Sequence, residues 1–277
     1  MTGNSPDWLR HGAEFLDTVR LRALVAYDGA PFHGFAANEG VRTVAGDIEA
    51  ALATVLGTPI TLTCAGRTDK GVHGWGQVIS FDAPADHLPL DELQRALNHH
   101  CGPAVVIRAI EAAPSDFDAR FDATARIYRY RIVTALVIDP FRAPTHWHLT
   151  EPLELAALRT GSDALLGEHD FSSFCRRPDP GPDGRQRSLV RRVDRAEWRQ
   201  RGDTVTFEIE ASSFCQQMVR AVVGTLVDVG RGRRPASDVH AVLVARDRSG
   251  AGQLAPPHGL MLWRVRYADA PGWVAST

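Results

Sequence analysis

A run of charged residues between glycines stands just before a stretch that reads as a buried strand. The sequence CAGRTDKGVHGWGQVISFD covers residues 64–82 and places Asp69 one residue before Lys70 and two residues after Arg67. Lys70 is the only lysine of the chain. The glycines permit positive φ, so the chain can turn sharply and direct side chains into a cleft. A solvated turn would explain the glycines, but not the apolar run that follows at residues 77–81.

Asp69 is a candidate catalytic carboxylate because two cations stand beside it in the sequence. An opposite charge nearby lowers the pKa of a carboxyl group, so we expect a lowered pKa for Asp69 and an ionised side chain at neutral pH. An ionised carboxylate held in position can act as a nucleophile, a general base or a metal ligand. Asp69 can equally close a turn, as aspartates commonly do. The pattern by itself leaves these roles open.

The composition is that of a globular protein without an overall surplus of positive charge. The 277 residues carry a formal net charge of −2 and are 44% hydrophobic, which is enough for one large or two ordinary domains. The basic surplus is local, because arginines gather at residues 176–201 and again at residues 231–234. Arginine suits contacts with phosphate, and the alternative is a solvated arginine-rich surface.

The cysteines and histidines indicate neither a disulfide framework nor a metal site. The four cysteines are Cys64, Cys101, Cys175 and Cys215. No pair has C-x-x-C spacing and no secretory signal is evident, so we expect reduced thiols in a cytoplasmic protein. No apolar run reaches the length of a membrane span. His146 and His148 lack companion ligands at metal-site spacing, and we expect them to alternate along an extended segment.

Hydrophobic periodicity predicts the same order of elements, β-α-β-β-α-β, in each half of the chain. In the first half the expected elements are strand 21–27, helix 44–56, strands 60–64 and 76–81, helix 88–98 and strand 104–110. In the second half they are strand 125–133, helix 152–166, strands 189–198 and 204–209, helices 215–229 and 237–245, and strand 260–267. Each half is a split βαβ plait, so we expect an α+β fold in which two tandem plaits share one sheet.

The expected domains are an N-terminal arm at residues 1–18, a first plait at 19–113 that carries Asp69, and a second plait at 114–277. The boundary lies in the segment 111–124. This plait hosts many activities, so it fixes no function. Its sheet face often reads RNA, which gives a weak indication of a nucleic-acid partner.

Further stretches share their order and spacing with one known family. They are Tyr27-Asp28-Gly29, Phe32-His33-Gly34, Thr43-Val44-Ala45-Gly46, FDARFDATARIYRY at residues 117–130, GEHDFSSF at 167–174, F-x-x-x-MVR-x-x-VG at 214–224 and APPHGL at 255–260. Together with AGRTDKGVH they run collinearly from about residue 21 to 267. Each piece is weak, but the ordered set resembles the tRNA pseudouridine synthases of the TruA type.

The resemblance implies an isomerase that converts uridine to pseudouridine at positions 38 to 40 of the tRNA anticodon stem-loop. It implies the pseudouridine synthase fold, with two ferredoxin-like halves on a mixed, mainly antiparallel sheet and a central active-site cleft. It further implies base flipping, no metal or organic cofactor, and a cytoplasmic homodimer. The carboxylate would add to C6 of the uracil, attack C1′ of the ribose or drive loss of the 2′ proton, and the sequence does not choose among these routes.

The resemblance also assigns roles to particular residues. Asp69 matches the catalytic carboxylate, and Arg67 matches the arginine that helps to turn the target base out of the stack. Tyr128 matches the tyrosine that stacks on the flipped base and takes part in proton transfer. Arg220, from the second half, matches the ion-pair partner of Asp69. The pair Gly259-Leu260 brings the last strand under the base, with Leu260 as an apolar wall.

Two positions depart from the family, and two other functions compete. Phe35-Ala36-Ala37 stands where tryptophan and glutamine are common, which questions the RNA contacts of that loop, and Lys70 stands where a small residue is usual. One rival function is a tandem plait that binds structured RNA without catalysis. The other is a metal-assisted hydrolase that uses Asp69, His73 and the pair His146/His148, although their spacing fits no ligand set.

Overall fold

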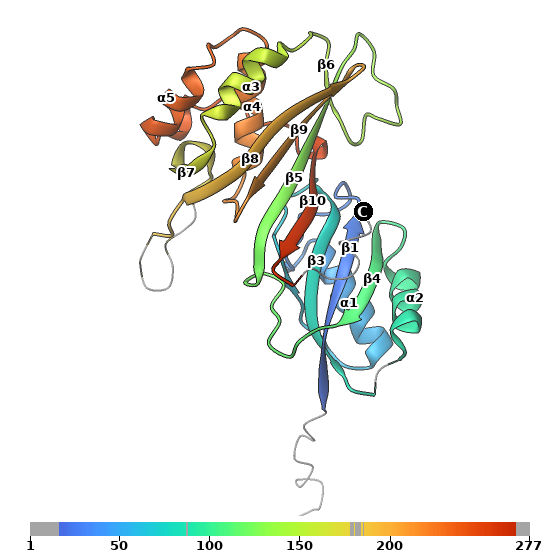
Figure 1. Ribbon diagram of the computed structural model, residues 1–277. Coiled ribbons are helices and arrows are strands. Elements are labelled where there is room, and N and C mark those ends of the chain that lie inside the picture. Colours follow the sequence, from blue (N-terminus) through green and yellow to red (C-terminus); the bar gives the residue numbers. More distant parts are fainter. Residues whose placement is uncertain (1–16, 87, 178–179, 181–183, 185, 270–277) are drawn as a thin grey trace, which may run out of the picture.

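The computed structural model of the protein describes residues 17–86, 88–177, 180, 184 and 186–269 (Figure 1). Its first half contains β1 (Thr18–Tyr27), α1 (Val44–Leu56), β2 (Thr63–Cys64), β3 (His73–Pro84), α2 (Leu90–Cys101) and β4 (Val105–Ala112). These elements form the sheet order β4-β1-β3-β2 with antiparallel neighbours throughout. The predicted split plait is therefore confirmed here. Most of the predicted arm lies outside the described residues, and Thr18 already begins β1.

The second half repeats this arrangement with several additions. Its elements are β5 (Ala123–Thr134), β6 (Trp147–Leu149), α3 (Leu155–Asp163), β7 (Gly167–Asp170), η2 (Ser172–Phe174), β8 (Val190–Arg201), β9 (Thr204–Ala211), α4 (Met218–Gly230), α5 (Asp238–Ala245), η3 (Arg248–Gly250), η4 (Pro257–Gly259) and β10 (Leu260–Tyr267). The order β10-β5-β9-β8 is again antiparallel, with β7 added at the edge. The α+β fold class is confirmed, while the short strands β6 and β7 were not predicted.

The two halves meet where β3 and β10 run side by side. These strands pair in parallel, with Met261 opposite His73 and Leu262 opposite Gly74. A Cβ atom at Gly76 would overlap the carbonyl oxygen of Trp263, so a glycine is needed for the two backbones to approach. The pairing joins the halves into one ten-stranded sheet. It also brings the turn that precedes β3, and hence Asp69, next to the start of β10.

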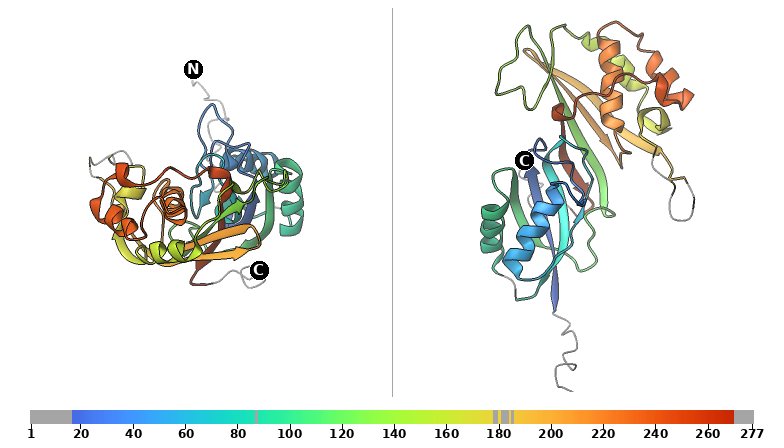
Figure 2. Two further views of the ribbon diagram at one scale, coloured as in Figure 1. Left: turned by 90° about the horizontal axis from the view of Figure 1, so that it is seen from above. Right: turned by 180° about the vertical axis from the view of Figure 1, so that it is seen from behind.

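The helices pack on one face of this sheet. That face points away from the viewer in Figure 1 and toward the viewer in the right panel of Figure 2. Helix α1 begins where the Thr43 hydroxyl accepts a hydrogen bond from the Gly46 N–H (3.2 Å) and ends at Gly57, which is left-handed with φ +70°. One apolar cluster packs α1 and α2 on β1, β3 and β4, and a larger one packs α3, α4 and α5 on the second half.

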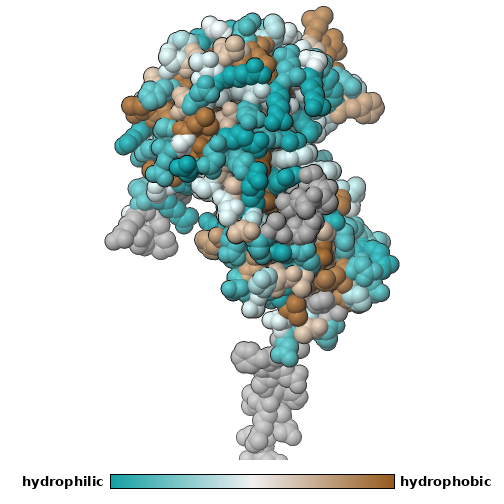
Figure 3. Space-filling view, viewed as in Figure 1, coloured by the Kyte–Doolittle hydropathy of each residue, from teal (hydrophilic) through white to brown (hydrophobic). Residues whose placement is uncertain are grey.

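The other face of the sheet is mainly hydrophilic, as Figure 3 shows in the view of Figure 1. An exception lies at the loop between β5 and β6. Leu136, Val137 and Phe141 expose 77–90% of their surface there. The loop is held at its base by Arg142, whose guanidinium donates two hydrogen bonds to the Asp203 carboxylate (2.9 and 2.8 Å). A fixed loop therefore carries an apolar tip that other described residues do not cover.

The expectation of four reduced thiols is wrong for one pair. Cys175 and Cys215 form a disulfide with their Cα atoms 5.8 Å apart, while Cys64 and Cys101 are free. The two bridged residues are 40 apart in the sequence. Their spacing therefore gave no sign that the fold brings the segment after η2 against the start of α4. The described residues contain no helix with the length and apolar character needed to cross a membrane.

Candidate active site

Asp69 stands in a tight turn between β2 and β3. The Val72 N–H donates to the Asp69 carbonyl oxygen (3.1 Å), and Gly71 adopts the left-handed φ of +77° that this turn requires. A Cβ atom at Gly71 would lie 3.1 Å from Cγ of Pro257, so the turn also packs against the segment before β10. The expected turn therefore exists, but a backbone hydrogen bond closes it and not the Asp69 side chain. The carboxylate remains available for other contacts.

The residues before Asp69 are anchored within the first half. The buried Gln77 side chain donates to the Gly66 carbonyl oxygen (2.6 Å) and accepts from the Gly66 N–H (3.4 Å). The Thr68 hydroxyl shares a hydrogen bond with the Tyr27 hydroxyl (2.9 Å), and the Thr68 carbonyl oxygen accepts from the Phe35 N–H (3.0 Å). The loop is therefore positioned before substrate binds. Phe35 is buried, so the aromatic residue at this departure from the family belongs to the core.

The Asp69 carboxylate faces residues from the second half of the chain. The Gln216 side-chain amide, the Gln217 backbone N–H and the charges of Arg220 and Arg176 all act on it and lower its pKa. Burial acts in the opposite direction and outweighs them, so the pKa of Asp69 is raised above its ordinary value. The predicted lowering is therefore wrong. The cations adjacent in the sequence, at positions 67 and 70, are exposed and do not dominate the environment of the carboxylate.

Arg220 extends from the first turn of α4 toward the first half. Its Nε donates to the Ala255 carbonyl oxygen (2.7 Å), and the Ala255 N–H donates to the Arg220 carbonyl oxygen (3.1 Å). Burial lowers the pKa of this guanidinium, while the nearby negative charge of Asp69 raises it. Among the described residues, no nitrogen of Arg220 lies within 4.0 Å of an Asp69 oxygen. The two charges therefore attract without the direct ion pair that the resemblance implies.

The start of α4 is shaped so that it presents polar groups to Asp69. Gln217 is left-handed with φ +66°, which is uncommon for a residue other than glycine and favours a functional role. The Arg176 N–H donates to the Gln216 carbonyl oxygen (3.0 Å), and the Cys175–Cys215 disulfide fixes the same two segments one residue away. Sequence reasoning missed Gln216, Gln217 and Arg176. The two glutamines stand at unassigned positions of the F-x-x-x-MVR stretch, and Arg176 was marked only as a member of the first arginine cluster.

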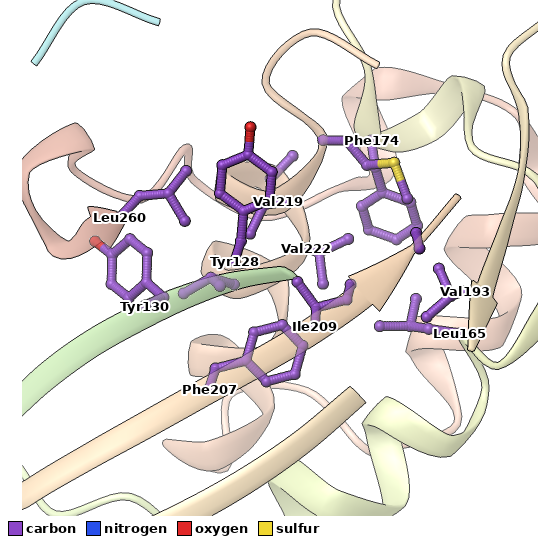
Figure 4. Close-up of a cluster of buried hydrophobic side chains, with 14 of the residues drawn as sticks. Tyr128, Tyr130, Leu165, Phe174, Val193, Phe207, Ile209, Val219, Val222 and Leu260 are labelled. Atoms are coloured by element: carbon purple, nitrogen blue, oxygen red, sulfur yellow. The ribbon is translucent and has the colours of Figure 1, made fainter. Parts of the chain in front are cut away.

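Tyr128 and Tyr130 lie side by side on the helix-covered face of β5. Figure 4 shows the Tyr128 hydroxyl pointing away from the apolar cluster, with Leu260 between the two tyrosines. Tyr128 has a buried ring that packs edge-on against Phe214 (5.1 Å between centroids), and its pKa is raised by burial and by the charges of Tyr27 and Asp69. Its hydroxyl makes no hydrogen bond within the described chain. It is therefore free to meet a substrate.

Tyr130 supports the segment that leads into β10. Its hydroxyl donates to the Pro256 carbonyl oxygen (2.8 Å), and a Cβ atom at Gly259 would lie 2.6 Å from its ring. Glycine at 259 is therefore the only residue that lets the segment pass over the ring. Leu260 pairs with Tyr130 across the two strands and is buried. The structure thus brings Asp69, Tyr128, Arg220 and Leu260 to one junction, while Arg67 is exposed.

Comparison with known proteins identifies the family of this chain. A family profile described as tRNA pseudouridine synthase matches residues 23–122 and 162–268. The chain belongs to the tRNA pseudouridine synthase family. It is 40% identical over 254 residues to the tRNA pseudouridine synthase A of Geobacillus kaustophilus, covering 91% of this chain and 96% of that one. It is 44% identical over 256 residues to the enzyme of the same name from Frankia casuarinae, covering 91% of both chains.

Histidines near the site of this synthase bind backbone groups. His73 Nδ1 lies 3.1 Å from the Gly29 N–H and 3.1 Å from an Asp28 carboxylate oxygen, while Nε2 lies 3.2 Å from the Pro144 carbonyl oxygen. One tautomer satisfies both backbone contacts, with Nε2–H donating and Nδ1 accepting, so we prefer the Gly29 bond over an ion pair to Asp28. His148 Nε2 lies 2.7 Å from the Ala135 carbonyl oxygen. These contacts do not favour the predicted alternative of a metal-assisted hydrolase.

The two arginine clusters of the synthase differ in how many of their charges are available. In the second cluster Arg231 and Arg233 approach Glu151 (2.9 and 3.7 Å), and Arg234 donates to the Gly250 carbonyl oxygen (2.7 Å). In the first cluster some strand arginines pair with acidic neighbours, as Arg195 does with Glu208 (2.7 Å), whereas Arg191 donates to the backbone carbonyl oxygens of Ser188 and Val190 (2.9 and 2.6 Å). Other arginines of the first cluster are exposed and make no side-chain ion pair or hydrogen bond within the described chain. They are Arg176, Arg177, Arg187 and Arg201.

Proposed function

We propose that this member of the family uses the Asp69 carboxylate to convert uridine to pseudouridine at positions 38 to 40 of the tRNA anticodon stem-loop. One observation supports the role of Asp69 above all. Its half-buried carboxylate comes from an anchored loop of the first half and faces Arg220, Arg176, the Gln216 amide and the Gln217 N–H from the second half. A carboxylate with opposing influences on its pKa at a junction of two halves is typical of a catalytic group.

The reaction breaks the N-glycosidic bond, rotates the uracil and joins its C5 to C1′ of the same ribose. Addition of the carboxylate to C6, attack on C1′ and loss of the 2′ proton each require Asp69 in its unprotonated form. Burial disfavours that form, and the groups from α4 and the segment before it favour it. The second half therefore keeps the carboxylate of the first half competent for reaction. No cofactor is needed for this chemistry.

Base flipping brings the uridine to this carboxylate, because a base inside a stem cannot be reached. Unstacking costs a few kcal/mol, and we infer that the exposed Arg67 repays part of this cost by contact with the phosphates or the vacated stack. The Tyr128 ring and the Leu260 side chain then form apolar walls for the uracil, with the Tyr128 hydroxyl able to exchange a proton with it. The exposed arginines at residues 176–201 extend the contact along the tRNA backbone.

We further propose a homodimer in the cytoplasm, where a tRNA substrate is found. Exposed apolar groups that gather in one place commonly mark an interface, and Leu136, Val137 and Phe141 form such a tip on a fixed loop. Light scattering on a sizing column tests this. Phe141→Ser is expected to shift a dimer toward monomer, whereas Val244→Ser, at another exposed apolar residue, is not. A monomeric wild-type protein would disprove the dimer without affecting the role of Asp69.

A direct assay tests the proposed chemistry. Pure protein is incubated with unmodified tRNA in parallel with and without excess chelator, and pseudouridine is mapped by carbodiimide treatment and primer extension. We expect stops at positions 38 to 40 with wild type and with the control Asp91→Asn, an exposed aspartate on α2. Asp69→Asn is expected to lose at least about a thousandfold in rate. Pseudouridine from Asp69→Asn would refute the proposal, no product from either protein would favour RNA binding without catalysis, and loss only with chelator would favour a metal.

The Asp69→Asn variant is expected to remain folded, which makes its loss of activity interpretable. Because the pKa of Asp69 is raised in the folded protein, the charged carboxylate costs stability at pH values above that pKa. At neutral pH the asparagine variant should therefore melt at the same temperature as wild type or higher. The difference should vanish as the pH falls below the ordinary range of a carboxyl group, where both states bind the proton. Thermal melts at pH 7.5 and in acid measure this.

A further inference from the structure

Arg126 is a buried cation beside the junction that the roles above leave unused. It stands on β5 two residues before Tyr128, so its side chain points to the same face of the sheet. Only 8% of the residue is exposed, and within the described residues no carboxylate pairs with it. A buried charge without a counter-charge is costly. Burial accordingly lowers the pKa of this guanidinium. The burial of this charge therefore calls for an explanation that an arginine on the surface would not require.

All five N–H groups of Arg126 donate to backbone carbonyl oxygens. Nε and Nη2 donate to Ala65 (3.1 and 2.8 Å), Nη1 donates to Ala123 and Ser212 (3.0 and 2.7 Å), and Nη2 also donates to Arg120. A guanidinium has five N–H groups in a rigid plane, so every donor is in use. Lysine has three donors on one atom and cannot reach carbonyl groups in so many directions.

Two of the four carbonyl groups that Arg126 joins belong to the two segments on either side of the carboxylate, and the other two, of Arg120 and Ala123, lie just before Arg126 itself. Ala65 begins the loop that ends in Asp69, and Ser212 begins the segment that ends in Gln216 and Gln217. The other side-chain hydrogen bonds that anchor the Asp69 loop come from the first half of the chain. In the part of the chain that the structure describes, Arg126 is the one side chain of the second half that binds this loop through hydrogen bonds to its backbone.

We propose that Arg126 is a positioning residue for the isomerisation, which sets the gap between the Asp69 loop and the segment 212–217. It does so from strand β5, the same strand that carries Tyr128, so one rigid element fixes the carboxylate, the polar groups that face it and the tyrosine. The inference rests on the proposed role of Asp69. It adds a residue that touches neither the substrate nor the carboxylate and still controls the reaction.

The proposal has a consequence that a purely structural role lacks. The groups that act on Asp69 are Arg220 on α4, Gln216 and Gln217 before it, Arg176 after η2 and Tyr128 on β5. If Arg126 no longer holds the segment 212–217, the Gln216 amide and the Gln217 N–H retreat and their lowering of the Asp69 pKa is lost. The acid limb of the pH–rate profile, over which the rate rises as Asp69 loses its proton, then moves to higher pH. A loss of stability alone would reduce the amount of folded enzyme without moving this limb.

Arg126→Lys tests this, with Arg131→Lys as the matched control on the opposite face of β5. Single-turnover rates on unmodified tRNA are measured from pH 5 to 9, with tRNA binding measured separately. We expect Arg126→Lys to lose about 10- to 100-fold in rate at neutral pH, to move the acid limb to higher pH, and to keep its tRNA affinity within about twofold. Arg131→Lys should behave as wild type.

Ser212→Gly gives a second route if the lysine variant fails to fold, because it leaves Arg126 intact and loosens the exposed backbone that Arg126 holds. It should move the acid limb in the same direction by a smaller amount. An unmoved limb in the variants that fold would overturn the proposal, whatever their melting temperatures. This outcome is distinct from a failure of the proposed function, which would appear as pseudouridine formation by Asp69→Asn.

Discussion

Replacement of Arg220 by glutamine should reduce turnover mainly at low pH. The structure bounds the effect. Two unit charges 4 Å apart attract by about 4 kcal/mol at an effective dielectric constant of about 20. Because no Arg220 nitrogen lies within 4.0 Å of an Asp69 oxygen, the attraction is weaker than this limit. We therefore expect a loss of about 1 to 3 kcal/mol, which corresponds to about 5- to 150-fold in the ionised fraction of Asp69 under acidic conditions.

The sign of the pH dependence follows from the direction of the Asp69 pKa. Burial already raises this pKa, and the Arg220 charge opposes the rise. Without that charge the pKa rises further, so the acid limb of the single-turnover rate should move to higher pH. The rate should recover toward wild type once the pH exceeds the new pKa. Arg220→Gln keeps a side-chain donor for the Ala255 carbonyl oxygen, and Arg220→Lys keeps the charge. A comparison of the two separates the charge from the hydrogen bond.

The assay is a single-turnover time course with enzyme in excess over unmodified tRNA, repeated from pH 5 to 9. We expect a moved limb for Arg220→Gln and a limb close to wild type for Arg220→Lys. The reasoning fails if Arg220→Gln loses rate equally at every pH, because Arg220 would then act by contact with the substrate. It also fails if both variants move the limb equally, because the charge that Arg220→Lys keeps would then not be what sets the limb.

Three further predictions concern stability, RNA binding and redox state. Gly224→Ala in α4 should destabilise the protein by about 3 kcal/mol, although alanine favours helices, because its Cβ would overlap the Gln253 carbonyl oxygen; urea denaturation decides the sign. Lys70→Ala should weaken tRNA binding modestly and reduce the salt slope by about one, and an unchanged slope and affinity in a salt titration would exclude a phosphate contact. Unreduced denatured protein should titrate two thiols and reduced protein four, whereas four thiols in both would disprove the Cys175–Cys215 disulfide.

The long periodic elements could be predicted from the sequence, and the short ones could not. Strand β10 has the predicted bounds because alternation of apolar residues at period two is a local signal. Helix α1 also has the predicted bounds, because its N-cap and the glycine after its last turn are local signals. Strands β6 and β7 span three and four residues, too few for a period to show. Helix α4 begins at Met218, later than the predicted residue 215. The backbone of Gln217 is left-handed, so the helix cannot begin before Met218. The spacing of apolar residues carries no information about the φ angle of a single residue.

The site divides in the same way between local and non-local information. Asp69, Tyr128 and Arg220 could be named because a resemblance carries single positions, and the fold does bring them to one junction. The direction of the Asp69 pKa was wrong because sequence neighbours were taken as spatial neighbours. Arg67 and Lys70 adjoin Asp69 in the chain, but both are exposed, whereas the carboxylate turns inward. Burial and the polar groups of α4 depend on packing between the halves, and no short stretch of sequence encodes that packing.

The division of labour between the halves explains why the site lies where β3 meets β10. The first half supplies a carboxylate on a loop that is anchored before substrate binds, and burial there makes the charged form unfavourable. The groups that restore the charged form come from the second half, together with the Tyr128 ring. The pKa of the Asp69 carboxyl group therefore depends on how the two halves pack against each other. The proposed role of Arg126 follows from this arrangement, because its hydrogen bonds join the loop of the first half to the segment of the second half that carries these groups.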